Sequence, residues 1–154
     1  KQVILSFKAI DQLDNIKGHP KIAEAGLNAV RVPVGYWIVG FDNHDPSDKN
    51  EWKVFAPNAL KHLDNLIKNW ANKHNVAVFL SFHAAKGSQN GMDHSAPPDP
   101  GQFIGVLPKN IDNTIDATSF LAKRYKDDPA FLGIGLLNEP SGNTGNDTLK
   151  SYYK

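Results

Sequence analysis

Three apolar runs along the chain share one pattern of hydrophobic residues. They are LNAVRVPV (27–34), VAVFLSFH (76–83) and FLGIGLLN (131–138), and each is nearly continuous rather than alternating with polar positions. A continuous apolar run of this length is typical of a parallel strand that is covered on both faces. The three runs therefore predict three buried parallel strands.

A helical pattern precedes each of these runs. The segment 19–26 has a proline near its start and a glycine at its end, as helices often do. The segments 55–75 and 109–129 each carry an apolar stripe at helical spacing. The stripe residues are Leu60, Leu63, Ile67 and Trp70, and then Ile111, Ile115, Leu121 and Tyr125. This alternation of helix and strand predicts an α/β fold with a parallel sheet and right-handed crossovers.

The connections after the strands are longer than those before them. The surplus lies in residues 35–55 and 84–109, so the interval between strands exceeds the about 31 residues per unit of a ~250-residue (β/α)₈ barrel. In barrels such loops build the active-site face, and in open sheets ligands also bind at the carboxyl ends of strands. We therefore expect function at residues 31–55, at 83–108 and from 138 onward.

The composition favours a neutral partner. The 154 residues are 40% hydrophobic, and 17 Lys and Arg stand against 16 Asp and Glu, with a net charge of +1. The chain has no block of basic residues of the kind that binds nucleic acid. No apolar stretch reaches the ~20 residues of a membrane span. The chain has no cysteine and no initiator Met, and we expect no cofactor. Residues 1–5 are too short an apolar run for a signal peptide.

Polar residues end each predicted strand, and these are the candidates for chemistry. They are Arg31, His83 and the pair Asn138 and Glu139. A carboxylate that is partly desolvated at the end of a buried strand has a raised pKa and can donate a proton near neutrality. An amide can hydrogen-bond a substrate hydroxyl, and a guanidinium can orient carboxylates. An ordinary surface or N-cap carboxylate is the alternative for Glu139.

Aromatic residues lie in or beside the first long loop. Such rings can stack on the faces of sugars, or they can pack against other side chains within the loop. The residues are Tyr36, Trp37, Phe41 and Trp52. Tyr36 is the best candidate for sugar stacking because it directly follows the strand.

Two further patterns are weak. A metal site at His83, Asp93 and His94 is disfavoured, since the spacing of tight ligand sets is missing. Gly133 and Gly135 lie inside a strand and lack the third glycine of a dinucleotide fingerprint. We therefore expect neither a metal nor a dinucleotide.

Three motifs together resemble glycoside hydrolase family 5, most closely the fungal and oomycete exo-β-1,3-glucanases. They are GLNAVRVPVGYW (26–37), FHAAKGSQNG (82–91) and GIGLLNEP (133–140), in this order and spacing. The resemblance implies a (β/α)₈ barrel, a retaining glycosidase and Glu139 as its acid/base. It also implies that Asn138 binds a substrate hydroxyl and that Arg31 and His83 belong to a supporting network.

A retaining glycosidase needs a second carboxylate about 5–5.5 Å from the first. In the family this nucleophile ends the seventh strand, which would lie beyond Lys154, and the strands found here correspond to the second, third and fourth. We therefore expect residues 1–154 to be the N-terminal portion of the catalytic domain. This incomplete barrel would lack the C-terminal half and the first strand, and would be inactive alone.

The chain departs from the family at three places. Ser81, Phe82 and His83 stand where Asp-Leu-His is frequent, which puts a supporting hydrogen bond in doubt. Met92 replaces an aromatic residue that follows Gln-Asn-Gly, and a thioether offers a sugar less rigid contact area than a ring. His94 stands where asparagine is usual.

These observations predict hydrolysis of β-1,3-linked glucan, with β-glucan as the partner. A β-1,4-glucanase or mannanase of the same family and a noncatalytic carbohydrate-binding half-barrel remain alternatives. The resemblance also implies a monomer when complete and an extracellular or cell-wall location. The sequon at Asn146, Asp147 and Thr148 is compatible with secretion.

Overall fold

The computed structural model describes residues 2–4, 19–44, 51–98 and 105–154. Its sheet has four parallel strands in the order of the chain: β1 (Gln2–Ile4), β2 (Ala29–Gly35), β3 (Ala77–Ala84) and β4 (Phe131–Gly135). Each apolar run that predicted a strand thus forms one. The prediction of a parallel α/β sheet is confirmed.

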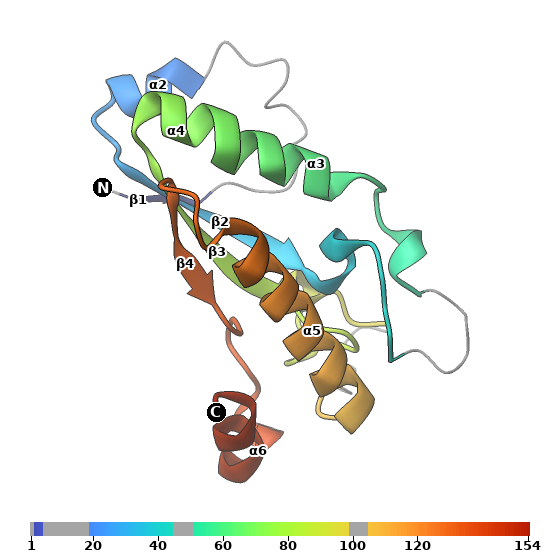
Figure 1. Ribbon diagram of the computed structural model, residues 1–154. Coiled ribbons are helices and arrows are strands. Elements are labelled where there is room, and N and C mark those ends of the chain that lie inside the picture. Colours follow the sequence, from blue (N-terminus) through green and yellow to red (C-terminus); the bar gives the residue numbers. More distant parts are fainter. Residues whose placement is uncertain (1, 5–18, 45–50, 99–104) are drawn as a thin grey trace.

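Helices separate the strands as the periodicity predicts (Figure 1). α2 (His19–Glu24) precedes β2, and Gly26 follows it at a φ of 73° that suits glycine. Before β3, α3 (Ala59–Asp64), the π-helical η3 (Asn65–Ala71) and α4 (Asn72–His74) follow one another without a break. The other helices are α5 (Pro108–Tyr125) and α6 (Asn146–Tyr152), and the short 3₁₀ turns are η1 (Tyr36–Val39), η2 (Glu51–Val54), η4 (Asp93–Ser95) and η5 (Gly142–Thr144).

The strand β1 lies in the part of the chain where the sequence shows no recognisable strand. Gln2 pairs with Ala29 and Ile4 with Arg31, so β1 extends the sheet on the far side of β2 from β3. A three-residue strand is too short to show any hydrophobic period, which is why the sequence does not reveal it.

The core lies on one face of the sheet. Every second residue of β2 and β3 is fully buried there, against the helices of residues 59–74 and against α5. Fully burying one such side chain stabilises a fold by about 1.5–3 kcal/mol. The buried set includes Val30, Val32, Val34, Val78, Leu80 and Phe82 from the strands, and Leu63, Leu66, Ile67 and Leu121 from the helices.

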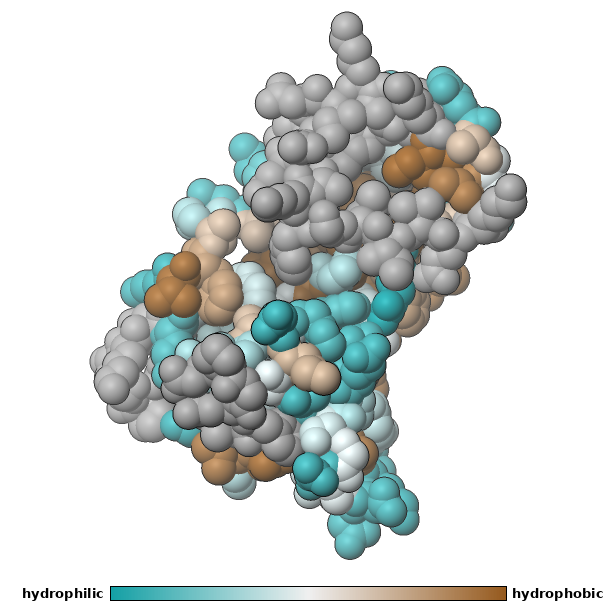
Figure 2. Space-filling model, turned by 180° about the vertical axis from the view of Figure 1, so that it is seen from behind, coloured by the Kyte–Doolittle hydropathy of each residue, from teal (hydrophilic) through white to brown (hydrophobic). Residues whose placement is uncertain are grey.

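The opposite face of the sheet is less covered, which corrects the expectation of strands buried on both sides. Arg31, Phe79 and His83 on this face are only half-buried among the described residues. Hydrophilic residues gather in the lower half of the view from behind, next to separate hydrophobic areas (Figure 2). The continuous apolar runs therefore predict the strands β2 and β3 correctly, but they overstate how far the second face of these strands is buried.

The glycines of β4 have a packing role. A side chain at Gly135 would place its Cβ 3.3 Å from the ring of Phe79 on the neighbouring strand, and at Gly133 the distance would be 3.9 Å. Small residues therefore leave room for the Phe79 ring on the less covered face. This accounts for the GxG pattern without a nucleotide.

The helix α5 buries a more polar stripe than the sequence suggests. Ile115 is 40% exposed, whereas Thr114 and Thr118 are buried. Each threonine hydroxyl donates to a carbonyl one turn earlier, Thr114 to that of Asn110 and Thr118 to that of Thr114, both at 2.8 Å. A hydroxyl that is satisfied in this way can enter the core, so the expected Ile111–Ile115 stripe is rotated.

One ion pair ties α3 to α5. Arg124 donates through Nε and a terminal nitrogen to the two carboxylate oxygens of Asp64, at 2.7 and 2.5 Å, and the Tyr125 hydroxyl donates to Asp64 at 2.9 Å. Burial alone would raise the pKa of Asp64, but these hydrogen bonds and the Arg124 and Lys68 charges outweigh it and lower that pKa. The carboxylate is thus a fixed partner in the helix layer.

Candidate active site

Arg31, the third residue of β2, connects β2 with β3 and with the segment after β4 on the less covered face. Its guanidinium donates to the Ser81 hydroxyl of β3 at 2.7 Å and to the side-chain oxygen of Asn138, after β4, at 2.8 Å. In the register Arg31 lies beside Phe79, and Ser81 is two residues further along β3 on the same face, so the long Arg31 side chain extends toward the carboxyl ends of the strands. The predicted meeting of Arg31 and Asn138 is therefore present. Ser81 supplies an acceptor despite the departure from Asp-Leu-His.

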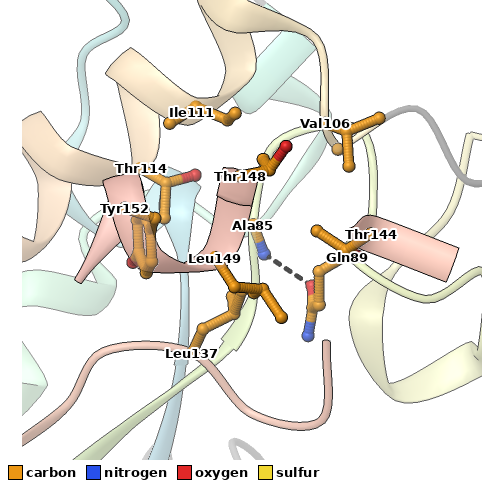
Figure 3. Close-up of a pocket in the computed structure, with 11 residues that line it drawn as sticks. Ala85, Gln89, Val106, Ile111, Thr114, Leu137, Thr144, Thr148, Leu149 and Tyr152 are labelled. Carbon is orange, nitrogen blue, oxygen red and sulfur yellow. Dashed lines mark hydrogen bonds between the residues drawn. The ribbon is translucent and has the colours of Figure 1, made fainter. Parts of the chain in front are cut away.

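Gln89 holds the ends of β3 and β4 together. Its side-chain nitrogen donates to the backbone oxygens of His83 at 2.7 Å and Asn138 at 2.8 Å, and its side-chain oxygen accepts from the Ala85 amide at 3.1 Å. The residue is 3% exposed, and its bond to Ala85 is drawn in Figure 3. The backbone of Asn138 also donates to Phe82 at 2.8 Å. Sequence reasoning missed Gln89, although the motif GSQNG contains it.

His83 lies beside this network with its Nε2 atom buried and without a hydrogen-bond partner among the described residues. Burial, followed by the nearby Arg31 charge and by His94, lowers the pKa of His83 below its usual 6.5, and Glu139 opposes this shift. A neutral imidazole beside a carboxylate is therefore the favoured state near pH 7.

Glu139 directly follows Asn138 in a strained backbone position. Its φ is 47°, in the left-handed region, and its carbonyl accepts from the side-chain nitrogen of Asn90 at 2.8 Å. Residues outside glycine hold this conformation only where the surroundings determine it. The bond from Asn90 therefore helps to hold the Glu139 backbone in this turn.

The Glu139 carboxylate corrects one expectation. Its side chain is 71% exposed, so it is not partly desolvated as predicted. The nearest ionisable partner that the described residues provide is His94, whose Nε2 lies 3.5 Å from a carboxylate oxygen. The desolvation argument fails because few side chains of the described residues surround this turn.

Tyr36 corrects a second expectation. It is 5% exposed and packs edge-on against Trp37 and Phe55, with ring centroids 5.4 and 6.0 Å apart. Its ring therefore belongs to the core and offers no face for a sugar. Trp37 stacks flat on Phe55 at 3.7 Å and 7°, and both rings line a surface hollow. Loop packing, the alternative reading, thus holds for Tyr36.

A buried ion pair connects the first and second long loops. The Lys86 ammonium lies 2.5 Å from a carboxylate oxygen of Asp42, and the two side chains are 4% and 1% exposed. Asp42 also accepts from the His44 amide at 2.9 Å. No local sequence signal marks this pair, because its members come from different loops.

Two hollows adjoin the network. One, of about 400 Å³, is lined by residues that include Trp37, Phe55, His83, Asp93 and His94. The other, of about 30 Å³, lies between α5 and α6, where Thr148, Leu149 and Tyr152 face Ile111 and Thr114 (Figure 3). The second has room for about one or two waters, whereas the first can take a sugar ring.

Metal and membrane features are absent from the described parts of the chain. No three His, Cys, Asp or Glu side chains there are grouped to hold a metal ion. None of the helices in these parts is long and apolar enough to cross a membrane.

Comparison with known proteins relates the chain to carbohydrate-active enzymes. The family model of Cellulase (glycosyl hydrolase family 5) matches residues 10–154. The probable glucan 1,3-beta-glucosidase A of Emericella nidulans is 41% identical over 137 residues, which are 86% of this chain and 31% of that protein. The sporulation-specific glucan 1,3-beta-glucosidase of Saccharomyces cerevisiae is 36% identical over 125 residues, 79% of this chain and 26% of that protein.

Among solved structures, the rutinosidase from Aspergillus niger has a TM-score of 0.65 at 16% identity. The match covers 84% of this chain and 34% of the rutinosidase, and it shows a shared fold. This chain spans about a third or less of the length of the curated relatives that it matches. The family match over most of the chain confirms the resemblance, and the chain belongs to glycosyl hydrolase family 5.

Proposed function

We propose that this chain is part of a retaining glycosidase that hydrolyses β-1,3-linked glucan, with Glu139 as the acid/base. Its sheet would be one side of a (β/α)₈ barrel, in which β2, β3 and β4 are the second to fourth strands and β1 is the first. The relatives named glucan 1,3-beta-glucosidase support this substrate. An extracellular or cell-wall location follows from such a substrate.

The observation that carries the proposal is the network at the strand ends. Arg31 occupies the side-chain oxygen of Asn138, so the amide nitrogen of Asn138 is directed to donate to another group, such as a substrate hydroxyl. Gln89 fixes the backbones of Asn138 and His83 in the same place. Glu139 therefore stands next to a rigid, polar floor that can orient a sugar before proton transfer.

The reaction would use Glu139 twice. It would first donate its proton to the glycosidic oxygen that leaves, while a second carboxylate attacks the anomeric carbon. It would then take a proton from the water that hydrolyses the glycosyl-enzyme intermediate. We place the second carboxylate in a later part of the protein, and this chain alone would not turn over. Further barrel units would also cover the exposed Glu139 side chain.

The experiment compares Glu139→Gln with wild type in the intact protein, on laminarin. The proposal predicts a fall in kcat/KM on the order of 10²- to 10⁴-fold, the usual value of general acid/base catalysis. Asp127→Asn is the matched control, since its side chain is 87% exposed at the end of α5. Wild-type turnover by Glu139→Gln would remove the assignment.

Two further measurements separate the alternatives. Proton NMR of the first product distinguishes retention from inversion, and retention gives the β-anomer. Because the family model is named Cellulase, carboxymethyl cellulose and mannan are the competing substrates. Faster hydrolysis of either one would favour a β-1,4-glucanase or mannanase, and binding of laminarin without turnover would favour a carbohydrate-binding half-barrel.

A further inference from the structure

His94 lies directly opposite the Glu139 side chain. It belongs to η4, in the loop that follows β3, and its Nε2 is 3.5 Å from a Glu139 carboxylate oxygen. The same Nε2 is 3.1 Å from the side-chain nitrogen of Asn90. The His83 ring packs edge-on against His94 at 6.1 Å. One nitrogen of His94 therefore has two competing partners.

Asn90 has a fixed orientation. Its side-chain oxygen accepts from the Met92 amide at 3.0 Å and from the Ser95 hydroxyl at 2.7 Å. A backbone amide can only donate, so the oxygen of Asn90 must point to it, and the NH₂ group must point the other way. That NH₂ group then donates one hydrogen to the Glu139 carbonyl and one to His94.

The donor at Asn90 determines what Nε2 of His94 can do. A neutral His94 that carries its proton on Nδ1 has one lone pair on Nε2, which accepts either from Asn90 or from a protonated Glu139 carboxyl. A protonated His94 loses the bond to Asn90, since two donors would face each other, and turns its Nε2 proton toward the Glu139 carboxylate. A proton can therefore lie between His94 and Glu139 when either of the two groups carries it on the facing atom.

The loop that carries His94 is held in place. The Ser88 and Ser95 hydroxyls lie 2.5 Å apart, and Ser88 also accepts from the Gly91 amide at 2.7 Å. Both serines are fully buried. The position of His94 thus comes from a rigid loop rather than from a free side chain, which is the condition for orienting a neighbour precisely enough for chemistry.

We propose that His94 is a positioning residue that holds the acid/base carboxyl of Glu139. Asn90 links the two residues, because its side-chain nitrogen bonds both to His94 and to the Glu139 carbonyl. This inference rests on the proposed function. His94 also lines the 400 Å³ hollow together with His83 and Asp93. It would act only in steps where Glu139 exchanges a proton.

The test uses kcat/KM of the intact protein on two substrates, because this constant reports the step in which the leaving group departs. Laminaribiose has a leaving group that needs a proton, whereas 2,4-dinitrophenyl β-glucoside has one that does not. We expect His94→Ala to lower kcat/KM on laminaribiose on the order of 10-fold to 10²-fold, the cost of a misplaced group. The value for the dinitrophenyl substrate falls much less, since its leaving group needs no proton.

A conservative variant and a control complete the design. Gln at this place has an acceptor for Asn90 and a donor for Glu139, so His94→Gln restores most of the laminaribiose activity. His74→Ala is the matched control, since His74 lies in α4 against Trp70. Equal losses on both substrates, or no loss on laminaribiose, would overturn the proposal. If Glu139→Ala also spares laminaribiose, the proposed function itself fails. If only His94→Ala spares it, this inference alone fails.

Discussion

Removal of the Lys86 ammonium would leave a carboxylate buried without its cation. Asp42 is 1% exposed at its side chain and lies 2.5 Å from Lys86, so Lys86→Met strands a charge where water cannot reach it. Breaking one partner of such a pair costs about 3–5 kcal/mol. The Glu51 carboxylate, 4.0 Å from Lys86 but 57% exposed, adds little because water screens it.

Urea unfolding of the intact protein, followed by circular dichroism at pH 7, measures this loss. Lys86→Met is expected to lower the unfolding free energy with an unchanged dependence on urea. The double variant Asp42→Asn with Lys86→Met removes both charges and recovers most of the loss, since an amide keeps an acceptor for His44. The exposed pair Lys126 and Asp127 serves as control, and Lys126→Met leaves the midpoint unchanged. A loss below about 1 kcal/mol for Lys86→Met, or a double variant no better than the single one, would refute the reasoning.

Three further changes test other parts of the structure. Folding lowers the pKa of Asp64, so the stability that its carboxylate contributes is complete above the unfolded pKa of 3.8 and is lost as pH falls through the folded pKa. Asp64→Asn should therefore weaken the fall of the unfolding free energy at acid pH, measured by urea unfolding. An unchanged fall would exclude this role of Asp64. An NMR titration of the His83 ring should give a pKa below 6.5, and Glu139→Gln should lower it further by removing an anion; a midpoint at or above 6.5 contradicts the burial argument. Gly105→Ala would bring a Cβ to 2.3 Å from the Ser88 carbonyl oxygen, so its melting temperature should fall, whereas the open position Gly142 should tolerate alanine.

The order of helices and strands is predictable because each element carries its own local pattern. β2, β3 and β4 are apolar runs, and the segment from Ala59 to His74 repeats its hydrophobic residues at helical spacing. β1 is too short for such a pattern, and only its pairing with β2 defines it. The buried face of α5 was misjudged because hydroxyls that bond to their own helix pass for exposed residues.

The site was predictable in position but not in environment. Parallel strands bring their carboxyl ends to one edge, and the long side chain of Arg31, the third residue of β2, extends to Asn138 there. Burial depends on what covers each residue, and so the sequence misjudges the exposure of Glu139 and the packing of Tyr36. Contacts between separate loops, such as Lys86 with Asp42, have no local signal at all. Ser81 could have been found, since a hydroxyl within an apolar run requires a partner.

Azide rescue of Glu139→Ala in the intact protein tests the central claim, that Glu139 exchanges the catalytic proton. In this variant a substrate such as 2,4-dinitrophenyl β-glucoside still forms the glycosyl-enzyme intermediate, because its leaving group needs no acid, but water attacks slowly without a base. Azide needs no base, so we predict that it raises kcat and that NMR identifies the product as β-glucosyl azide, with retained configuration. A kcat that does not respond to azide, or a product that is only glucose, would contradict the account.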